Sequence, residues 1–330
     1  MTYQDIDIPL PAFIAIDWTC MTIALVPIIL RFWLRCRSQP QPLTRNLADG
    51  LVVFSWLSGI VLISINAWKN GLRQQYIHYP PSELYYGVPL PLSAHLLYLS
   101  WISLFFIYIS LWAAKFALLA FYASLLSLMQ TRTARVLLIC AVAFTGATFI
   151  LHIVLLTRWC TPISSNWDVS GHLCSAVHDI NSVTISTVAN IATDLVILTL
   201  PLFALSSLSQ GRKLTMQSGI GKREVSGLAF VLCMAALSIS AALARWVTLK
   251  LVQDVPKADI THTIDVWALV EIVASLLAVC LPSLRSFIRR KREANKRGTV
   301  MGVQKYTKRS QSVETELSLE PALGMSSTHV

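Results

Sequence analysis

Five charged side chains stand well inside long apolar stretches of the sequence, away from their ends, and these residues are the best placed to do chemistry. They are Asp17, Lys115, Asp194, Arg245 and Glu271. A charged group inside a bilayer is costly when it faces lipid, so each of these side chains should face the protein interior and a partner. Buried groups of this kind can bind a polar ligand, and Asp194, Glu271 and Asp17 are also candidate catalytic acids or bases.

The depth of each charge within its stretch predicts two ion pairs. With a rise of about 1.5 Å per residue in a helix, Lys115 and Asp194 come to similar depths, and so do Arg245 and Glu271. We therefore predict a deeper Lys115–Asp194 pair and an outer Arg245–Glu271 pair, which Asp17 could join. These pairs could hold helices in register, or they could surround a polar ligand or a proton, and the residues alone leave both interpretations open.

The stretches that carry these charges have the composition and length of membrane-spanning helices. Hydrophobic residues make up 55% of the 330 residues and charged residues 13%, whereas a soluble domain carries about 25% charged residues. A helix needs about 20 apolar residues to cross the hydrocarbon core of a bilayer. Seven stretches meet that length: Leu10–Leu34, Leu47–Trp68, Ala94–Leu128, Val136–Leu156, Val183–Leu205, Val225–Val252 and Ile264–Ile288.

The seven stretches predict an all-α fold, a seven-transmembrane helix bundle without a separate soluble domain. They are continuously apolar, which argues against the alternating strands of a barrel. We expect an extracytoplasmic N-terminal segment (1–9), a transmembrane domain (10–288) and a basic, disordered cytoplasmic tail (289–330). The third stretch is longer than one crossing needs, so we expect it to start as a helix outside the bilayer or to tilt strongly.

The Lys and Arg residues are divided unevenly between the two ends of the predicted helices. Twenty of the 27 lie on one side and five on the other. Because cytoplasmic loops carry the excess of positive charge, the N-terminus should lie outside and the C-terminus inside. Ten of the basic residues fall in the tail from Arg285 to Arg309, where they would face anionic lipid head groups. We therefore expect the lipid bilayer, and no nucleic acid, as the partner of the basic residues.

Two of the seven cysteines, Cys160 and Cys174, share a polar loop on the side predicted to be outside. Disulfides persist in such oxidising surroundings, and a closed loop of this length stabilises a protein by about 3 kcal/mol. Two free thiols are one alternative, and zinc bound together with His172 and His178 is another. The spacing matches no common zinc pattern, so we predict a disulfide and no metal.

Motifs in several parts of the chain follow one family's pattern. The polar loop reads CTPISSNWD…GHLC, the fifth stretch contains NIATDLVILTLPL, and the seventh contains EIVASLLAVCLPSLRSF. Lys115 and Tyr122 in KFALLAFY, and Arg245 in the sixth stretch, agree with the same pattern. Together these motifs resemble the fungal rhodopsin-domain-like integral membrane proteins, a family with receptor-like and satratoxin-cluster members, over most of the chain.

The resemblance implies a receptor-like or accessory protein that senses or handles a small lipophilic metabolite in a fungal secondary-metabolite pathway, with a cytoplasmic protein partner. A membrane-embedded cyclase or isomerase, with Asp194, Glu271 or Asp17 as acid or base, is a second class. A transporter is a third, although the sequence shows no inverted repeat. A retinal Schiff base needs a Lys in the last span, and the seventh stretch has none. We therefore expect no chromophore and no other cofactor.

Overall fold

Long helices make up most of the described structure. The computed structural model describes residues 9–36, 43–80, 83–126, 132–170, 174, 176, 179–214, 222–252 and 265–280. Its labelled elements are α1 (Leu10–Cys36), α2 (Leu43–Gln75), β1 (Leu84–Tyr85), β2 (Val88–Pro89), α3 (Leu90–Leu126), α4 (Arg132–Arg158), η2 (Ile163–Asn166), α5 (Ile180–Leu214) and α6 (Lys222–Val252). A further helix, which we call the last helix, covers 265–280.

The predicted helical fold is confirmed, and six of the seven predicted spans are long and apolar enough to cross a membrane. The seventh span falls on the last helix, whose described part alone is too short to be counted as a full crossing. The predicted N-terminal segment and tail lie outside the described residues, apart from residue 9. Most helices extend past their apolar stretches, because polar residues beyond the hydrocarbon core can continue the backbone hydrogen-bond ladder.

α3 begins directly after a short hairpin that the sequence analysis did not predict. β1 and β2 pair antiparallel with Tyr85 opposite Val88. The two residues between them, Tyr86 and Gly87, have φ values of 58° and 78°, as a two-residue type I′ turn requires. The Arg73 Nε of α2 donates a hydrogen bond to the Tyr86 carbonyl at 3.2 Å. The hairpin is thereby attached to the end of α2 as well as to the start of α3.

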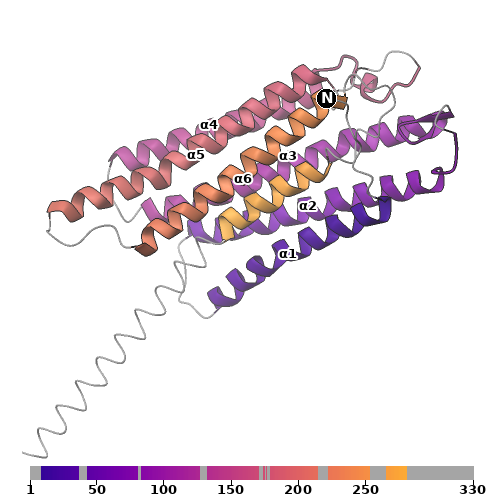
Figure 1. Cartoon of the computed structure of the whole chain (residues 1–330). Coiled ribbons are helices and arrows are strands. Elements are labelled where there is room, and N and C mark those ends of the chain that lie inside the picture. The colour runs from indigo at the N-terminus through magenta and orange to yellow at the C-terminus, as the bar shows by residue number, and fades with distance from the viewer. Residues whose placement is uncertain are drawn as a thin grey trace, which may run out of the picture. The chain divides into compact units, whose positions relative to one another are not determined.

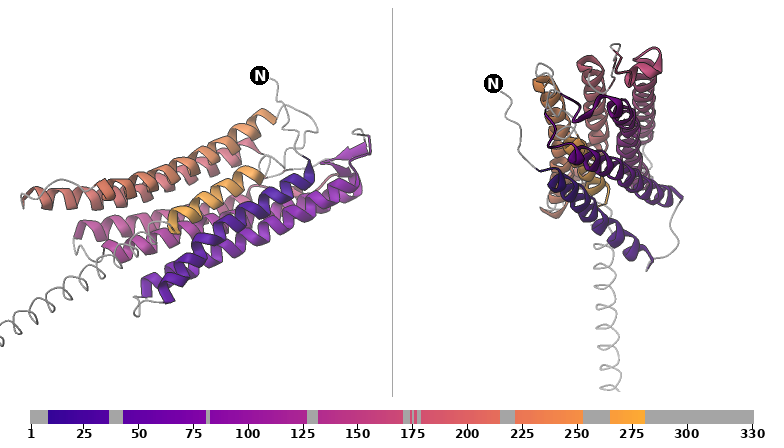
Figure 2. Two further views of the ribbon diagram at one scale, coloured as in Figure 1. Left: turned by 60° about the horizontal axis from the view of Figure 1, so that its bottom comes forward. Right: turned by 90° about the vertical axis from the view of Figure 1, so that its right-hand side faces the viewer.

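α3 is the central helix of the bundle. In its most apolar part 61% of the residues are buried, against 22% for α4. α3 packs most extensively on α2, and it also contacts α4 and α5. Figures 1 and 2 show the last helix, in light orange, lying between α6 and α1. Its Ile272 and Leu276 belong to a buried apolar cluster with Met21 of α1, Val52 of α2 and Trp112 of α3.

The outside of the bundle is apolar, while polar groups face one another inside. Val26, Ile150 and Val188 are 62–63% exposed, as expected where lipid would cover the surface. At the α2–α3 contact, the Ser55 hydroxyl donates to the Ser110 carbonyl at 2.7 Å, and the Ser110 hydroxyl donates to the Ser55 carbonyl at 2.8 Å. Small hydroxyl side chains of this kind let two membrane helices approach closely.

The loop after α4 is closed by the predicted disulfide, with Cys160 and Cys174 bonded at an S–S distance of 2.10 Å. The prediction is confirmed, and it removes both thiols as zinc ligands. Asn166 is buried within the loop and donates from Nδ2 to the Ile163 carbonyl at 3.0 Å. Trp167 contacts the ring of Trp101 on α3, with centroids 5.5 Å apart. The loop is thus held against the end of α3, which we call the disulfide end of the bundle.

Candidate functional site

Lys115 of α3 extends toward α5, where each proton of its ammonium group can meet an oxygen atom. Its Nζ lies 2.8 Å from Asp194 Oδ1. It also donates to the side-chain oxygen of Asn190 at 2.7 Å and to the Asn190 carbonyl at 3.0 Å. An ammonium group has three donors, so Lys115 is satisfied although it is only 4% exposed. The ring of Trp112, 4.9 Å from Nζ, adds a cation–π contact.

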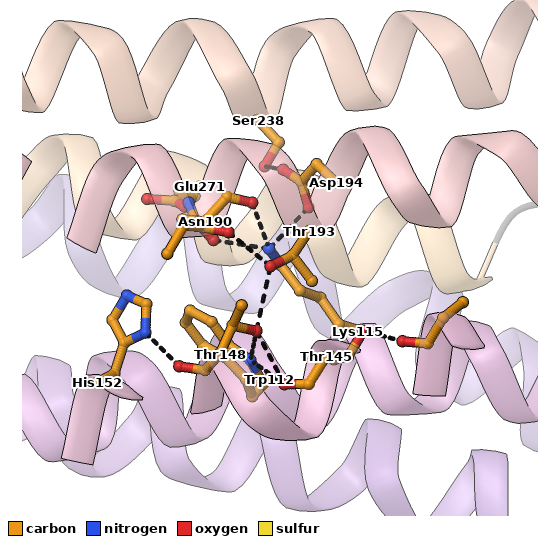
Figure 3. Close-up of polar contacts among 12 residues, drawn as sticks. Trp112, Lys115, Thr145, Thr148, His152, Asn190, Thr193, Asp194, Ser238 and Glu271 are labelled. Atoms are coloured by element: carbon orange, nitrogen blue, oxygen red, sulfur yellow. Dashed lines mark hydrogen bonds and ion pairs between the residues drawn. The ribbon is translucent and has the colours of Figure 1, made fainter. Parts of the chain in front are cut away.

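Asn190 connects this pair to the second predicted pair. Its side-chain nitrogen donates a close hydrogen bond to Glu271 Oε1 on the last helix. Glu271 Oε2 lies 3.6 Å from Arg245 Nη2 of α6, which is an ionic contact too long for a hydrogen bond. Both ion pairs expected from depth are therefore present, and one amide joins them. We call Lys115, Asn190, Asp194, Arg245 and Glu271 the central polar network, and Figure 3 shows most of it.

Asn190 was not among the predicted site residues, although it is the first residue of the NIATDLVILTLPL motif. The available signal was its spacing from Asp194. Residues four apart lie on the same face of a helix, so Asn190 and Asp194 both face Lys115. Two cations and two carboxylates make the network neutral as a whole, which lowers the cost of placing it in a low-dielectric interior.

Polar groups on α4 hold α3 and α5 in place beside the network. The indole Nε1 of Trp112 donates to the Thr145 carbonyl at 2.9 Å. The hydroxyls of Thr148 on α4 and Thr193 on α5 lie 3.2 Å apart. His152 Nδ1 lies 2.6 Å from the Thr148 carbonyl. These contacts, drawn in Figure 3, position the helices that carry Lys115 and Asn190.

A small cavity of about 40 Å³ adjoins the Lys115–Asp194 pair. The Ser238 hydroxyl of α6 donates to Asp194 Oδ2 at 3.1 Å, so the cavity has a polar end made of these three side chains. Its other walls are small or apolar side chains of α3, α5, α6 and the last helix, including Ala235 and Met234. A volume of this size admits a few water molecules.

Asp17 lies in a different cluster from the one expected. Its main charged neighbours are Asp265 and Lys69, and Lys69 Nζ lies 3.3 Å from Asp265 Oδ2. The prediction that Asp17 could join the Arg245–Glu271 pair is therefore not supported, because α1 and the start of the last helix bring Asp17 to Lys69 instead. The second predicted span ends at Trp68, one residue before Lys69, whereas α2 continues to Gln75 and buries Lys69 with 1% exposure.

A fourth ion pair lies toward the other end of the bundle. Arg31 of α1 lies near the end of the first predicted span, and it is 2% exposed. Its Nε lies 2.7 Å from Asp49 Oδ1 of α2, and its Nη1 donates to the Val279 carbonyl of the last helix at 3.0 Å. Arg31 therefore connects three helices. Hydropathy did not reveal this pair, because both residues lie near the ends of their spans.

Among the described residues, no three His, Cys, Asp or Glu side chains gather in an arrangement that could hold a metal ion. The site offers two cations, two carboxylates, an amide and several hydroxyls beside a cavity. Such a set can hold polar groups of a guest molecule by hydrogen bonds.

The comparisons with known proteins agree with this architecture. Residues 30–290 match the fungal rhodopsin domain, a region that includes every member of the central polar network and both disulfide cysteines. No curated protein and no solved structure matches the chain at the threshold applied. The apolar helices and the match over most of the sequence show that this is a polytopic membrane protein, and the chain belongs to the fungal rhodopsin domain family.

Proposed function

We propose that this protein is receptor-like or accessory in function and binds a small lipophilic metabolite between its helices, beside the Lys115–Asp194 pair. Its N-terminus lies outside and its basic tail lies in the cytoplasm, in accord with the distribution of Lys and Arg. The metabolite belongs to a fungal secondary-metabolite pathway, a part of the proposal that rests on the family resemblance.

The cavity beside Asp194 is the observation that carries this proposal. It combines a charged and hydroxyl-bearing end with apolar walls, the arrangement expected of a site for an apolar molecule with one polar group. At about 40 Å³ it is smaller than a metabolite, so binding must enlarge it. Met234 of α6 forms part of the wall, and a flexible Met side chain can move at low cost.

The same geometry suggests how a guest would act on a cytoplasmic partner. α5 and α6 both line the cavity, and the short loop 215–221 joins them in the sequence. A guest that displaces α6 would move this loop, whose flanks carry Arg212, Lys213, Lys222 and Arg223. We assign the protein partner to this basic loop.

Metabolite profiling of a deletion strain, compared with strains that carry Asp194→Asn or Glu271→Gln, tests the proposal. A receptor predicts that the deletion and both variants alter the amounts of many pathway products together, since they remove a signal. Thr199→Val is the matched control, because Thr199 lies on α5 but faces outward, and it should behave as wild type. Membrane levels of each variant, measured by immunoblotting, separate lost function from lost protein.

Two outcomes would replace the proposal. Accumulation of one intermediate in the Asp194→Asn and Glu271→Gln strains, with normal protein levels, would indicate a membrane-embedded enzyme. Substrate flux in vesicles that contain the purified protein would indicate a transporter. A wild-type metabolite profile in the deletion strain would remove the link to secondary metabolism.

A further inference from the structure

Four buried polar atoms on α5, α6 and the last helix have no hydrogen-bond partner in the described part of the chain. They are Thr187 Oγ1, Arg245 Nε, Trp267 Nε1 and Glu271 Oε2. The side chains of Thr187, Arg245 and Glu271 are among the most buried polar groups, with residue exposures of 3%, 4% and 0%. Buried polar atoms are nearly always hydrogen-bonded, so four unpaired atoms in one region indicate that a missing molecule completes them.

Helix register places two of these atoms, Thr187 Oγ1 and Trp267 Nε1. Thr187 precedes Asn190 by three residues and Trp267 precedes Glu271 by four, so each lies one turn away on the same face of its helix. Because Asn190 and Glu271 are hydrogen-bonded to each other, Thr187 and Trp267 lie on the same side of that contact, toward the disulfide end.

Arg245 approaches the same place from α6. Its guanidinium contacts Glu271 at 3.6 Å, and its neighbour Trp246 donates from Nε1 to the Thr184 hydroxyl of α5 at 2.7 Å. The backbone of Arg245 is therefore level with the part of α5 that precedes Thr187. At about 1.5 Å per residue, Trp267 and Glu271 lie about 6 Å apart along their helix, and the backbones of Thr187 and Arg245 lie at levels near or between them.

The chemistry of the four atoms selects the group that would satisfy them. Arg245 Nε and Trp267 Nε1 can only donate, Glu271 Oε2 accepts, and the Thr187 hydroxyl can do either. A hydroxyl oxygen accepts two hydrogen bonds and donates one, so it can receive the Trp267 N–H and the Thr187 O–H and donate to the Glu271 carboxylate, whose charge Arg245 balances. An ionic guest would add an uncompensated charge to a neutral network, whereas a neutral hydroxyl would not.

We propose that Thr187, Arg245, Trp267 and Glu271 form a subsite for the hydroxyl group of a lipophilic alcohol. This proposal rests on the proposed function, since it specifies one polar group of the guest. The subsite lies on the disulfide side of the Asn190–Glu271 contact and is distinct from the cavity at Asp194 and Ser238.

The test uses the full-length protein in lipid nanodiscs, with 1-decanol and its methyl ether, 1-methoxydecane, as probes. The half-saturating concentration of each probe is obtained from the rise of Tm with probe concentration. We expect decanol to bind wild type more tightly than the ether. We expect two variants, Thr187→Val and Trp267→Phe, to weaken the binding of decanol about fivefold each and to leave the binding of the ether unchanged. Each variant keeps the shape of the side chain but removes one hydrogen-bonding group, and fivefold is the effect of one neutral hydrogen bond. Thr199→Val and Trp18→Phe, at exposed positions, are matched controls for effects of the alcohol on the bilayer.

The outcomes separate the subsite from the wider proposal. If wild type binds alcohol and ether equally, the hydroxyl subsite is overturned. The same holds if Thr187→Val changes the binding of decanol no more than Thr199→Val does. Either result leaves a lipophilic guest site in place. Failure of both probes to raise the Tm would count against the lipophilic guest itself. An experimental structure with a water bound to the four atoms, combined with no preference for the alcohol, would show a structural water only and would also overturn the subsite.

Discussion

Neutralising either member of the Lys115–Asp194 pair should destabilise the protein, and exchanging the two charges should recover part of the loss. Asp194→Asn preserves the size of the side chain but leaves the Lys115 ammonium with an amide in place of a carboxylate. Among the described residues, Lys115→Met leaves the Asp194 carboxylate with the Ser238 hydroxyl as its one hydrogen-bond donor. Exchange by Lys115→Asp with Asp194→Lys restores opposite charges at the same two positions.

The expected loss of stability follows from the distance between Lys115 and Asp194 and from the burial of both side chains. Two unit charges 2.8 Å apart attract each other by about 6 kcal/mol at an effective dielectric constant of about 20. Desolvation offsets part of this attraction, and removal of one partner from a buried pair costs about 3 to 5 kcal/mol. The Asp194 side chain is 12% exposed, and Lys115 retains two acceptors on Asn190, so we expect Asp194→Asn to cost about 3 kcal/mol.

A double-mutant cycle on purified protein in mixed micelles measures this coupling. Unfolding by SDS, followed by circular dichroism, gives the unfolding free energy of wild type, Lys115→Met, Asp194→Asn and the double variant. We expect a coupling energy of about 2 to 3 kcal/mol, in the upper range for residues in contact. The control Thr199→Val should stay within about 0.5 kcal/mol of wild type. A coupling below about 0.5 kcal/mol, or an exchanged variant less stable than both single variants, would refute the assigned pair.

Three further predictions concern the bridge, the loop and the hairpin. Asn190→Leu should destabilise the protein by more than about 2 kcal/mol in the same assay, because it leaves Lys115 and Glu271 each short of a hydrogen bond. If the loss of stability is no larger than that of Thr199→Val, Asn190 does not connect the two ion pairs. Cys160→Ser should lower the unfolding free energy by about 3 kcal/mol, and reductant should no longer change the Tm of this variant. If reductant lowers the Tm of the variant as much as that of wild type, the disulfide does not contribute this stability. Burial raises the pKa of Tyr86 to about 12, so in ultraviolet titrations Tyr86→Phe should remove absorbance that appears near pH 12 rather than pH 10. The hairpin's stability should accordingly fall as the pH rises above the normal tyrosine pKa of about 10. If Tyr86→Phe instead removes absorbance that appears near pH 10, the raised pKa of the half-buried Tyr86 is contradicted.

The parts of the structure that could be predicted from sequence are those controlled by local properties. Apolar length determines which segments can cross a bilayer, and this predicted α1 to α6 closely. Charges inside apolar stretches are few, so helix depth sufficed to match Lys115 with Asp194 and Arg245 with Glu271. The disulfide followed from only two cysteines that share a polar loop.

The parts that could not be predicted depend on where helices end and on how they pack. Lys69 and Arg31 were not among the predicted site residues, because both lie at or near the ends of apolar stretches, although α1 and α2 continue past these stretches and bury both residues. Asn190 was quoted only as part of a motif and was given no role, because the sequence does not show that a lysine and a glutamate lie on either side of its amide. The hairpin depends on a Tyr86 with positive φ, a conformation that tyrosine rarely adopts.

The central claim is that ionised groups from separate helices meet in the interior and satisfy one another there. Solid-state NMR on the protein in lipid bilayers can test it through the distance between Lys115 Nζ and the carboxyl carbon of Asp194, with ¹⁵N-labelled Lys and ¹³C-labelled Asp and with Lys115→Gln to assign the signal. We expect about 3.5 to 4 Å, the separation set by a charge-assisted hydrogen bond. A distance beyond about 6 Å, outside the reach of a direct ion pair, would contradict the account.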